Sequence, residues 1–263
     1  MFLTRNSASH QPRRFWGCAT FASMLLLGGC AGLKSAPLSD EALDASSWAQ
    51  ASDLPEPAKG ARWHHQGIGD RPVSTYTPVL RAGRPALKAH SERGDSLVRL
   101  PLKVEGPDVG RLRFSWWVDA LNPAADLADR HLDDAVARVI LQFGGDRSVF
   151  SGRDHMLSNL MQTLTGEPLP YATLIYVWDH RYPVGTVILH ARSPRIKTLV
   201  IESGNARLGQ WVDFDRDISA DFQKAFGHAP HRLKGIALMT DSNNTRRLSQ
   251  AWYGPIRWTP SAQ

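Results

Sequence analysis

The sequence predicts an all-β protein, built as a two-sheet β-sandwich of jelly-roll type with one or two short helices. The dominant apolar period is two, since Val98, Leu100 and Leu102 alternate with neighbours such as Arg99 and Lys103. This alternation is typical of strands with one buried face. Only two segments have helical spacing, and strands and helices do not alternate regularly, which argues against a parallel α/β sheet. Two stacked sheets are therefore the expected architecture.

The predicted strands follow one another with Gly, Pro, Asn and Asp between them. They span 73–80, 85–91, 97–104, 111–119, 135–143, 172–178, 185–191, 196–202, 209–215, 234–240 and 250–258. Two short helices are predicted from apolar spacing: 154–164, with Met156, Leu157, Leu160, Met161 and Leu164, and 218–226, with Ile218, Phe222 and Phe226.

The first 29 residues have the profile of an export signal. Arg5, Arg13 and Arg14 precede an apolar run that is too short for a stable transmembrane helix. The run ends in Leu-Gly-Gly-Cys at Cys30, which resembles the bacterial lipobox. We therefore expect Cys30 to carry a diacylglyceryl anchor, because two acyl chains suffice for stable membrane attachment. Ordinary secretory cleavage is the alternative.

The cysteine count, the net charge and the residue after Cys30 bear on the disulfides, partners and location of the mature chain. Cys18 leaves with the signal and Cys30 is modified, so we expect no disulfide. Removing three arginines and no acids lowers the formal net charge from +6 to +3. The remaining charges are mixed, which makes nucleic acid a poor partner. Because Ala31 follows the cysteine where an aspartate would favour inner-membrane retention, we expect attachment to the outer membrane, facing the periplasm.

Composition divides the chain into three parts. Residues 1–29 are the signal peptide. Residues 30–60 are rich in Ala, Ser, Pro and Asp and almost lack apolar periodicity, which predicts a flexible tether. Residues 61–260 contain the strands and most of the tryptophans, which predicts a single β-sandwich domain.

Familiar catalytic and nucleotide-binding motifs are absent from the sequence. We find no Gly-x-Ser-x-Gly elbow, His-Glu-x-x-His, Walker loop or Gly-x-Gly-x-x-Gly after a strand. The acidic run Asp213, Asp215 and Asp217 begins like an EF-hand loop but lacks its glycine and its final glutamate. A solvated strand face, with Asp217 capping the helix that follows, is the favoured interpretation.

Asp133 and Asp134 precede an apolar run that begins near Arg138. Adjacent carboxylates on a strand point to opposite faces, so one of them can face inward and pair with an arginine. A buried structural pair is slightly favoured. The alternative is a groove in which these residues bind a polar ligand.

The segment 241–245 contains Asp241, Asn243 and Asn244 between two predicted strands. Most such polar clusters are turns, and we weigh a turn alone at about two to one. Carboxylates and amides at short reach can also bind a hard cation or sugar hydroxyls.

Two tryptophans in predicted strands have polar neighbours. Trp117 shares a strand face with Arg113 and Asp119, and Trp178 precedes Asp179. An exposed aromatic ring beside polar groups is a common way to hold a sugar. The histidines have no metal-binding spacing, so we predict neither a metal site nor a cofactor.

Taken together, several segments resemble the bacterial domain-of-unknown-function family 3047 (DUF3047). They are 112–118 (LRFSWWV), Arg130 with 133–139 (DDAVARV), 176–178 (YVW), 221–222 with 226–227, 235–237, 241–245 (DSNNT) and 251–254 (AWYG). The resemblance covers roughly residues 61–259. It implies a fold similar to galactose-binding-like jelly rolls, and it carries no activity or catalytic residue to transfer.

The leading hypothesis is a non-catalytic envelope domain that binds a polar ligand, with a glycan as the favoured class. Its contacts would be Trp178, Asp133 or Asp134, Arg138 and the loop with Asp241, Asn243 and Asn244. One alternative is a glycosidase that uses two facing carboxylates, such as Asp134 and Asp241. The other is an assembly protein that binds another envelope protein through an exposed apolar patch.

Overall fold

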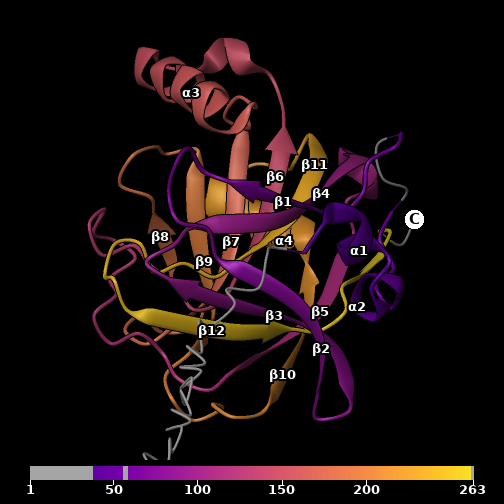
Figure 1. The fold of residues 1–263 in the computed structure, drawn as a ribbon. Coiled ribbons are helices and arrows are strands. Elements are labelled where there is room, and N and C mark those ends of the chain that lie inside the picture. The colour runs from indigo at the N-terminus through magenta and orange to yellow at the C-terminus, as the bar shows by residue number, and fades with distance from the viewer. Residues whose placement is uncertain (1–37, 56–58, 262–263) are drawn as a thin grey trace, which may run out of the picture. The chain divides into compact units, whose positions relative to one another are not determined.

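Two β-sheets pack face to face in the computed structural model, which describes residues 38–55 and 59–261 (Figure 1). The order of strands in the seven-stranded sheet is β1 (His64–Gly67), β4 (Ser96–Glu105), β11 (Arg232–Met239), β6 (Arg138–Gly144), β7 (Ala172–Asp179), β9 (Ile196–Ser203) and β8 (Val187–Leu189). The six-stranded sheet has the order β10 (Trp211–Asp217), β5 (Arg111–Val118), β12 (Leu248–Tyr253), β3 (Arg84–Glu92) and β2 (Thr75–Arg81), and its sixth strand, β13 (Arg257–Thr259), pairs with β5.

The chain crosses repeatedly between the two sheets. β3, β4, β5 and β6 alternate from one sheet to the other, and so do β10, β11 and β12. All neighbouring strands are antiparallel except β7 and β9. The predicted β-sandwich of jelly-roll type is confirmed.

The core lies between the sheets and is rich in large aromatic side chains. Trp116 of β5 and Trp178 of β7 are fully buried, and their ring centroids are 6.4 Å apart. Phe114 stacks on Tyr176 across the same interface at 6.0 Å. Burial of each such side chain stabilises the fold by about 1.5–3 kcal/mol.

Helices α3 (Gly152–Thr165) and α4 (Ile218–Phe226) confirm the two predicted helices. α3 begins two residues earlier than predicted because Ser151 and Asp154 form a capping box ahead of the apolar residues. The side chain of Asp217 accepts a hydrogen bond from the Ala220 amide, as predicted for a cap. Two 3₁₀ turns, η1 (Gly106–Asp108) and η2 (Arg147–Val149), complete this part of the chain. None of the described helices has the length and apolarity needed to cross a bilayer.

Several strand predictions differ from the structure. β8 is shorter than the predicted 185–191, and β10 lies two residues later than the predicted 209–215. The strand predicted at 135–143 begins only at Arg138, because the backbone before it bonds to loops. The strand predicted at 250–258 is split into β12 and β13 around Pro255, which has no amide to donate. β1 was not predicted, since His64, His65 and Gln66 show no apolar alternation.

Residues 38–55 are not the predicted flexible tether. They form α1 (Asp40–Asp44) and α2 (Ser47–Gln50), and the side chain of Trp48 is fully buried. The indole Nε1 of Trp48 donates to the Gly254 carbonyl at 3.0 Å, and Asp53 bridges to β13. Each of these short helices buries only one apolar side chain. The sequence therefore shows little helical periodicity here, and the segment was predicted to be flexible. The predicted signal peptide, Cys30 and the tether up to residue 37 lie outside the described residues.

Candidate functional site

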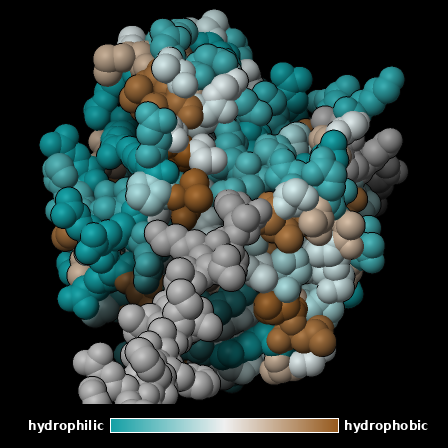
Figure 2. All heavy atoms as spheres, in the orientation of Figure 1, coloured by the Kyte–Doolittle hydropathy of each residue, from teal (hydrophilic) through white to brown (hydrophobic). Residues whose placement is uncertain are grey.

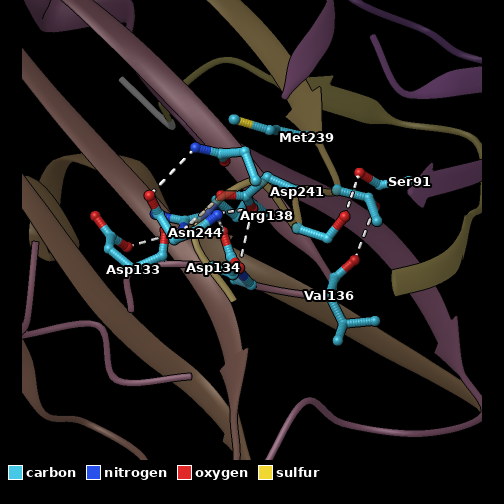
Figure 3. A network of polar contacts seen from close by, with 12 residues as sticks. Ser91, Asp133, Asp134, Val136, Arg138, Met239, Asp241 and Asn244 are labelled. Atoms are coloured by element: carbon cyan, nitrogen blue, oxygen red, sulfur yellow. Dashed lines mark hydrogen bonds and ion pairs between the residues drawn. The ribbon is translucent and has the colours of Figure 1, made fainter. Parts of the chain in front are cut away.

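Arg138 is the centre of a buried polar network on the outer side of the seven-stranded sheet (Figure 3). Val139 packs between the sheets, so the preceding Arg138 points to the opposite face. The guanidinium donates to Asp241 Oδ1 at 3.0 Å and Oδ2 at 3.2 Å. It also donates to Asp133 Oδ1 at 2.8 Å. Asp133, Asp134, Arg138, Asp241 and Asn244 are called the Arg138 network below.

The second carboxylate of the pair, Asp134, ties the 241–245 loop in place. It accepts from the Asn244 amide at 3.1 Å and from the Thr245 amide at 2.6 Å. The Thr245 hydroxyl donates to the same carboxylate at 2.6 Å. The Asn244 side chain donates to the Asp133 carbonyl, and Asn243 bonds only to Asn244 among the described residues. The loop is therefore held mainly by Asp133 and Asp134 of the preceding segment.

One guanidinium faces several carboxylates in this network, and the charges of these groups shift one another's pKa values. Burial raises the pKa of Asp241 to about 7, against the attraction of Arg138 and with added repulsion from Asp134 and Asp133. Burial would also raise the pKa of Asp133, but Arg138 and His190 outweigh it and hold that pKa below the usual range. Burial opposes the charge of Arg138, yet Asp241 and Asp133 raise its pKa.

Trp178 is buried to 1% exposure, and its indole Nε1 donates to the Gly204 carbonyl at 3.0 Å. A small recess lies beside it and is lined by Asn122, Asp134 and Asp179, among others. Its interior has room for about one water molecule. A sugar ring cannot stack on Trp178 in this arrangement.

The structure brings Asp133, Asp134, Arg138, Asp241, Asn243 and Asn244 together, but not around an open groove. Asp134, Arg138 and Asp241 are buried and the other three are partly buried. Arg138 pairs with Asp241 and Asp133, which agrees with the slightly favoured interpretation of a buried aspartate–arginine pair. The glycosidase hypothesis required Asp134 and Asp241 to face each other across a groove, and both carboxylates instead bind protein donors. In the described part of the chain, no group of three His, Cys, Asp or Glu side chains could hold a metal ion.

A different set of tryptophans lies on the outer face of the six-stranded sheet. Trp116, Val212 and Tyr253 point into the core. Side chains alternate between the two faces of a strand, so their chain neighbours Trp117, Trp211 and Trp252 point outward. Trp211 of β10 pairs with Trp117 of β5, which pairs with Trp252 of β12. We call Trp211, Trp117 and Trp252 the tryptophan row.

Two arginines stack on the tryptophan row. The guanidinium carbon of Arg81 is 4.4 Å from the Trp117 ring centroid and 4.1 Å from that of Trp252. Arg84 lies 4.7 Å from the Trp211 ring centroid. Trp117 and Trp211 meet edge to face with centroids 5.9 Å apart. These cation–π and aromatic contacts hold the rings in fixed orientations.

Carboxylates complete the surface around the rings. Asp119 accepts from Arg81 at 2.9 and 3.0 Å and from the Trp117 indole at 2.6 Å. Asp213 accepts from Arg84 at 2.6 Å. The side chains of Arg81, Arg84, Asp119 and Asp213 are 31–69% exposed, and Trp117 and Trp211 are partly exposed. Trp252 is only 5% exposed, because Arg81 and Lys88 lie over its ring. The surface thus offers aromatic edges, fixed donors and fixed acceptors to solvent.

Sequence reasoning found one member of this surface and missed the others. Trp117 was identified from its strand face, which the structure confirms together with the polar neighbours Arg113 and Asp119. Trp211 and Trp252 pass unnoticed because their alignment with Trp117 depends on strand order. The acidic run on β10 is a solvated strand face, as predicted, with Asp215 paired to Arg111 and Arg113.

Comparisons with known proteins give one family and distant structural similarities. The family model described as "Protein of unknown function (DUF3047)" matches residues 61–257. No curated protein matches the chain. The xyloglucanase domain of NopAA, a type three effector from Sinorhizobium fredii solved with cellobiose, is 7% identical, with a TM-score of 0.41 over 78% of this chain and 96% of that one. A structure described as CBM4 is 8% identical, with a TM-score of 0.34 over 76% of this chain and 87% of that one. TM-scores below 0.5 say nothing about a ligand of this chain.

Proposed function

For a chain that belongs to the DUF3047 family, we propose a non-catalytic glycan-binding domain whose ligand contacts the tryptophan row. The domain is exported and held at the outer membrane, facing the periplasm, by a lipid on Cys30. The observation that carries the binding proposal is the in-register alignment of Trp211, Trp117 and Trp252 on an outward sheet face.

The chemistry of the surface suits a polar ligand with flat apolar faces. A pyranose ring presents C–H groups that pack on indole and hydroxyls that bond to charged groups. Arg81 and Arg84 keep donors free beyond their ion pairs, because a guanidinium has five N–H groups. Asp119 and Asp213 supply acceptors beside them. Since the rings and charges are already ordered, binding costs little conformational entropy.

The test measures binding to glycans of the periplasm. Peptidoglycan sacculi, their soluble fragments and a panel of neutral and uronic-acid oligosaccharides serve as probes for the mature chain. We expect saturable binding to at least one probe. Trp211→Ala should weaken it at least about tenfold in Kd, as truncation of a central aromatic contact does. Thermal unfolding of the same sample shows whether the fold persists.

Arg113→Ala is the matched control. Arg113 lies on the same outer face of β5 as Trp117, is well exposed and pairs with Asp215 outside the row. This substitution should leave Kd unchanged. Equal losses for Trp211→Ala and Arg113→Ala, or no binding to any probe, would rule out the tryptophan row as a glycan site.

A further inference from the structure

Helix α3 presents two large apolar side chains to solvent, although Leu157, Met161 and Leu164 on the same helix are partly buried. Asp154 and Ser158 are its buried residues, whereas Met156 is 68% and Leu160 is 51% exposed. Val149, in the turn η2 before the helix, is 56% exposed. Figure 2 shows an apolar patch among hydrophilic residues at the end of the molecule where Figure 1 places α3. The apolar face of Val149, Met156 and Leu160 thus has no covering element among the described residues.

Arginines surround this apolar face. Arg153 lies on α3 itself, Arg147 in η2, and Arg192 and Arg195 in the neighbouring β8–β9 connection. Arg153 donates to the Ala191 carbonyl and Arg195 to the Val149 carbonyl, which joins the two segments. Of the nearby acids, Asp154 is buried and Glu167 is paired with Arg99. Asp146 is exposed, and its carboxylate caps η2 by accepting from Ser148. An apolar patch flanked by arginines is complementary to an anionic lipid surface.

The chain between the proposed anchor and the folded domain is short. Because α1 begins at Asp40, only residues 31–39 separate Cys30 from the first helix. Ten Cα–Cα steps span at most about 35 Å when fully extended. The thirty-residue tether expected from the sequence would have allowed roughly three times that distance. The start of the domain must therefore remain near the bilayer.

Strand β1 connects the start of the domain to α3. The Asp40 carboxylate accepts from the His65 amide at 2.8 Å. One residue further, Gln66 donates to the Thr165 carbonyl at the end of α3, and the Gly69 amide donates to the Leu164 carbonyl. Four residues of extended chain span about 13 Å. The start of the domain and the carboxyl end of α3 are thus neighbours.

We propose that the face formed by Val149, Met156 and Leu160 on η2 and α3 contacts the surface of the bilayer that carries the Cys30 lipid, with the surrounding arginines on anionic headgroups. The inference rests on the anchor in the proposed function and is independent of the tryptophan row. Contact with the bilayer would fix which face of the domain points away from the membrane.

The test uses the full lipidated chain, in which Cys30 is modified and an introduced cysteine can be labelled alone. Met156→Cys carries an environment-sensitive dye, and the purified protein is reconstituted in vesicles with or without anionic phospholipid and a lipid-borne quencher. Leu80→Cys is the control, since Leu80 is also apolar and is 72% exposed near the end of β2, a strand that lies away from α3 (Figure 1). We expect quenching at position 156, stronger with anionic lipid, and none at position 80.

Several results would contradict the proposal. Equal emission at positions 156 and 80 means that α3 faces water. A blue shift at position 156 that the lipid quencher leaves unchanged means that a protein, such as a second copy, covers the face instead. Release of the unlabelled chain from membranes to the same extent as its Cys30→Ala variant removes the anchor premise, and this result is separate from either dye signal.

Discussion

The Arg138 network and the tryptophan row contain the same kinds of residue and lie on opposite sides of the sandwich. Both combine arginine and aspartate on the outer face of a sheet, and both have a tryptophan nearby, which for the network is Trp178 of the core. Loops cover the network, so its charges are saturated by one another and by backbone amides. Among the described residues, the charged groups of the row stay partly exposed. Residue type alone does not separate a structural cluster from a binding surface, whereas the covering loops do.

The two regions should first differ in what a lost tryptophan costs. Trp178 is fully buried, so Trp178→Ala should lower the free energy of unfolding by about 3–5 kcal/mol. Trp211 is partly exposed on the edge strand β10. Trp211→Ala should therefore lower the free energy of unfolding clearly less than Trp178→Ala does. Urea unfolding of both variants gives the comparison. Similar losses would mean that the row is as structural as the core and would weaken its assignment as a ligand surface.

The Arg138 network itself should be intolerant of truncation. Asp241→Ala leaves the buried guanidinium of Arg138 with only Asp133, and breaking a buried pair typically costs about 3–5 kcal/mol. Asp241→Asn keeps the shape and one acceptor and should cost less. Chemical denaturation measures both. A near-neutral Asp241→Ala would show that the network is solvated and open, which would restore it as a ligand site.

The Arg138 network should also make the stability of the protein depend on pH. The folded pKa of Asp241, raised by burial to about 7, exceeds the value of about 3.9 for an unfolded aspartate. Between these values the folded state binds more protons, so the free energy of unfolding falls as pH rises from about 4 to 7. The slope approaches about 1.4 kcal/mol per pH unit. Subtracting the profile of Asp241→Asn isolates this group, and a zero difference would contradict the raised pKa.

The sequence was informative about strands and much less so about the site. Period-two alternation located most strands and placed Trp117 outward, because one strand is enough to define a face. The burial of Asp134 depends on its contacts with the 241–245 loop, and that of Trp178 on packing against the other sheet. Local sequence patterns do not reveal contacts between distant segments. The tryptophan row requires the order β10, β5, β12, which joins residues more than 90 positions apart. The prediction of a flexible tether failed because Leu43 and Trp48 are each the single buried apolar residue of a short helix and so form no periodic pattern.

The smallest expected difference concerns how the tryptophan row is ordered. Arg81 stacks between Trp117 and Trp252 while its guanidinium bonds both oxygens of Asp119. Lysine retains the charge but loses the planar fork, so Arg81→Lys should lower the free energy of unfolding by about 1 kcal/mol. Because the rings then move more freely, glycan affinity should fall more than stability does, which paired binding and unfolding measurements would reveal. A variant with unchanged affinity would mean that the rings need no arginine to stay aligned, and that the stacking serves the sheet alone.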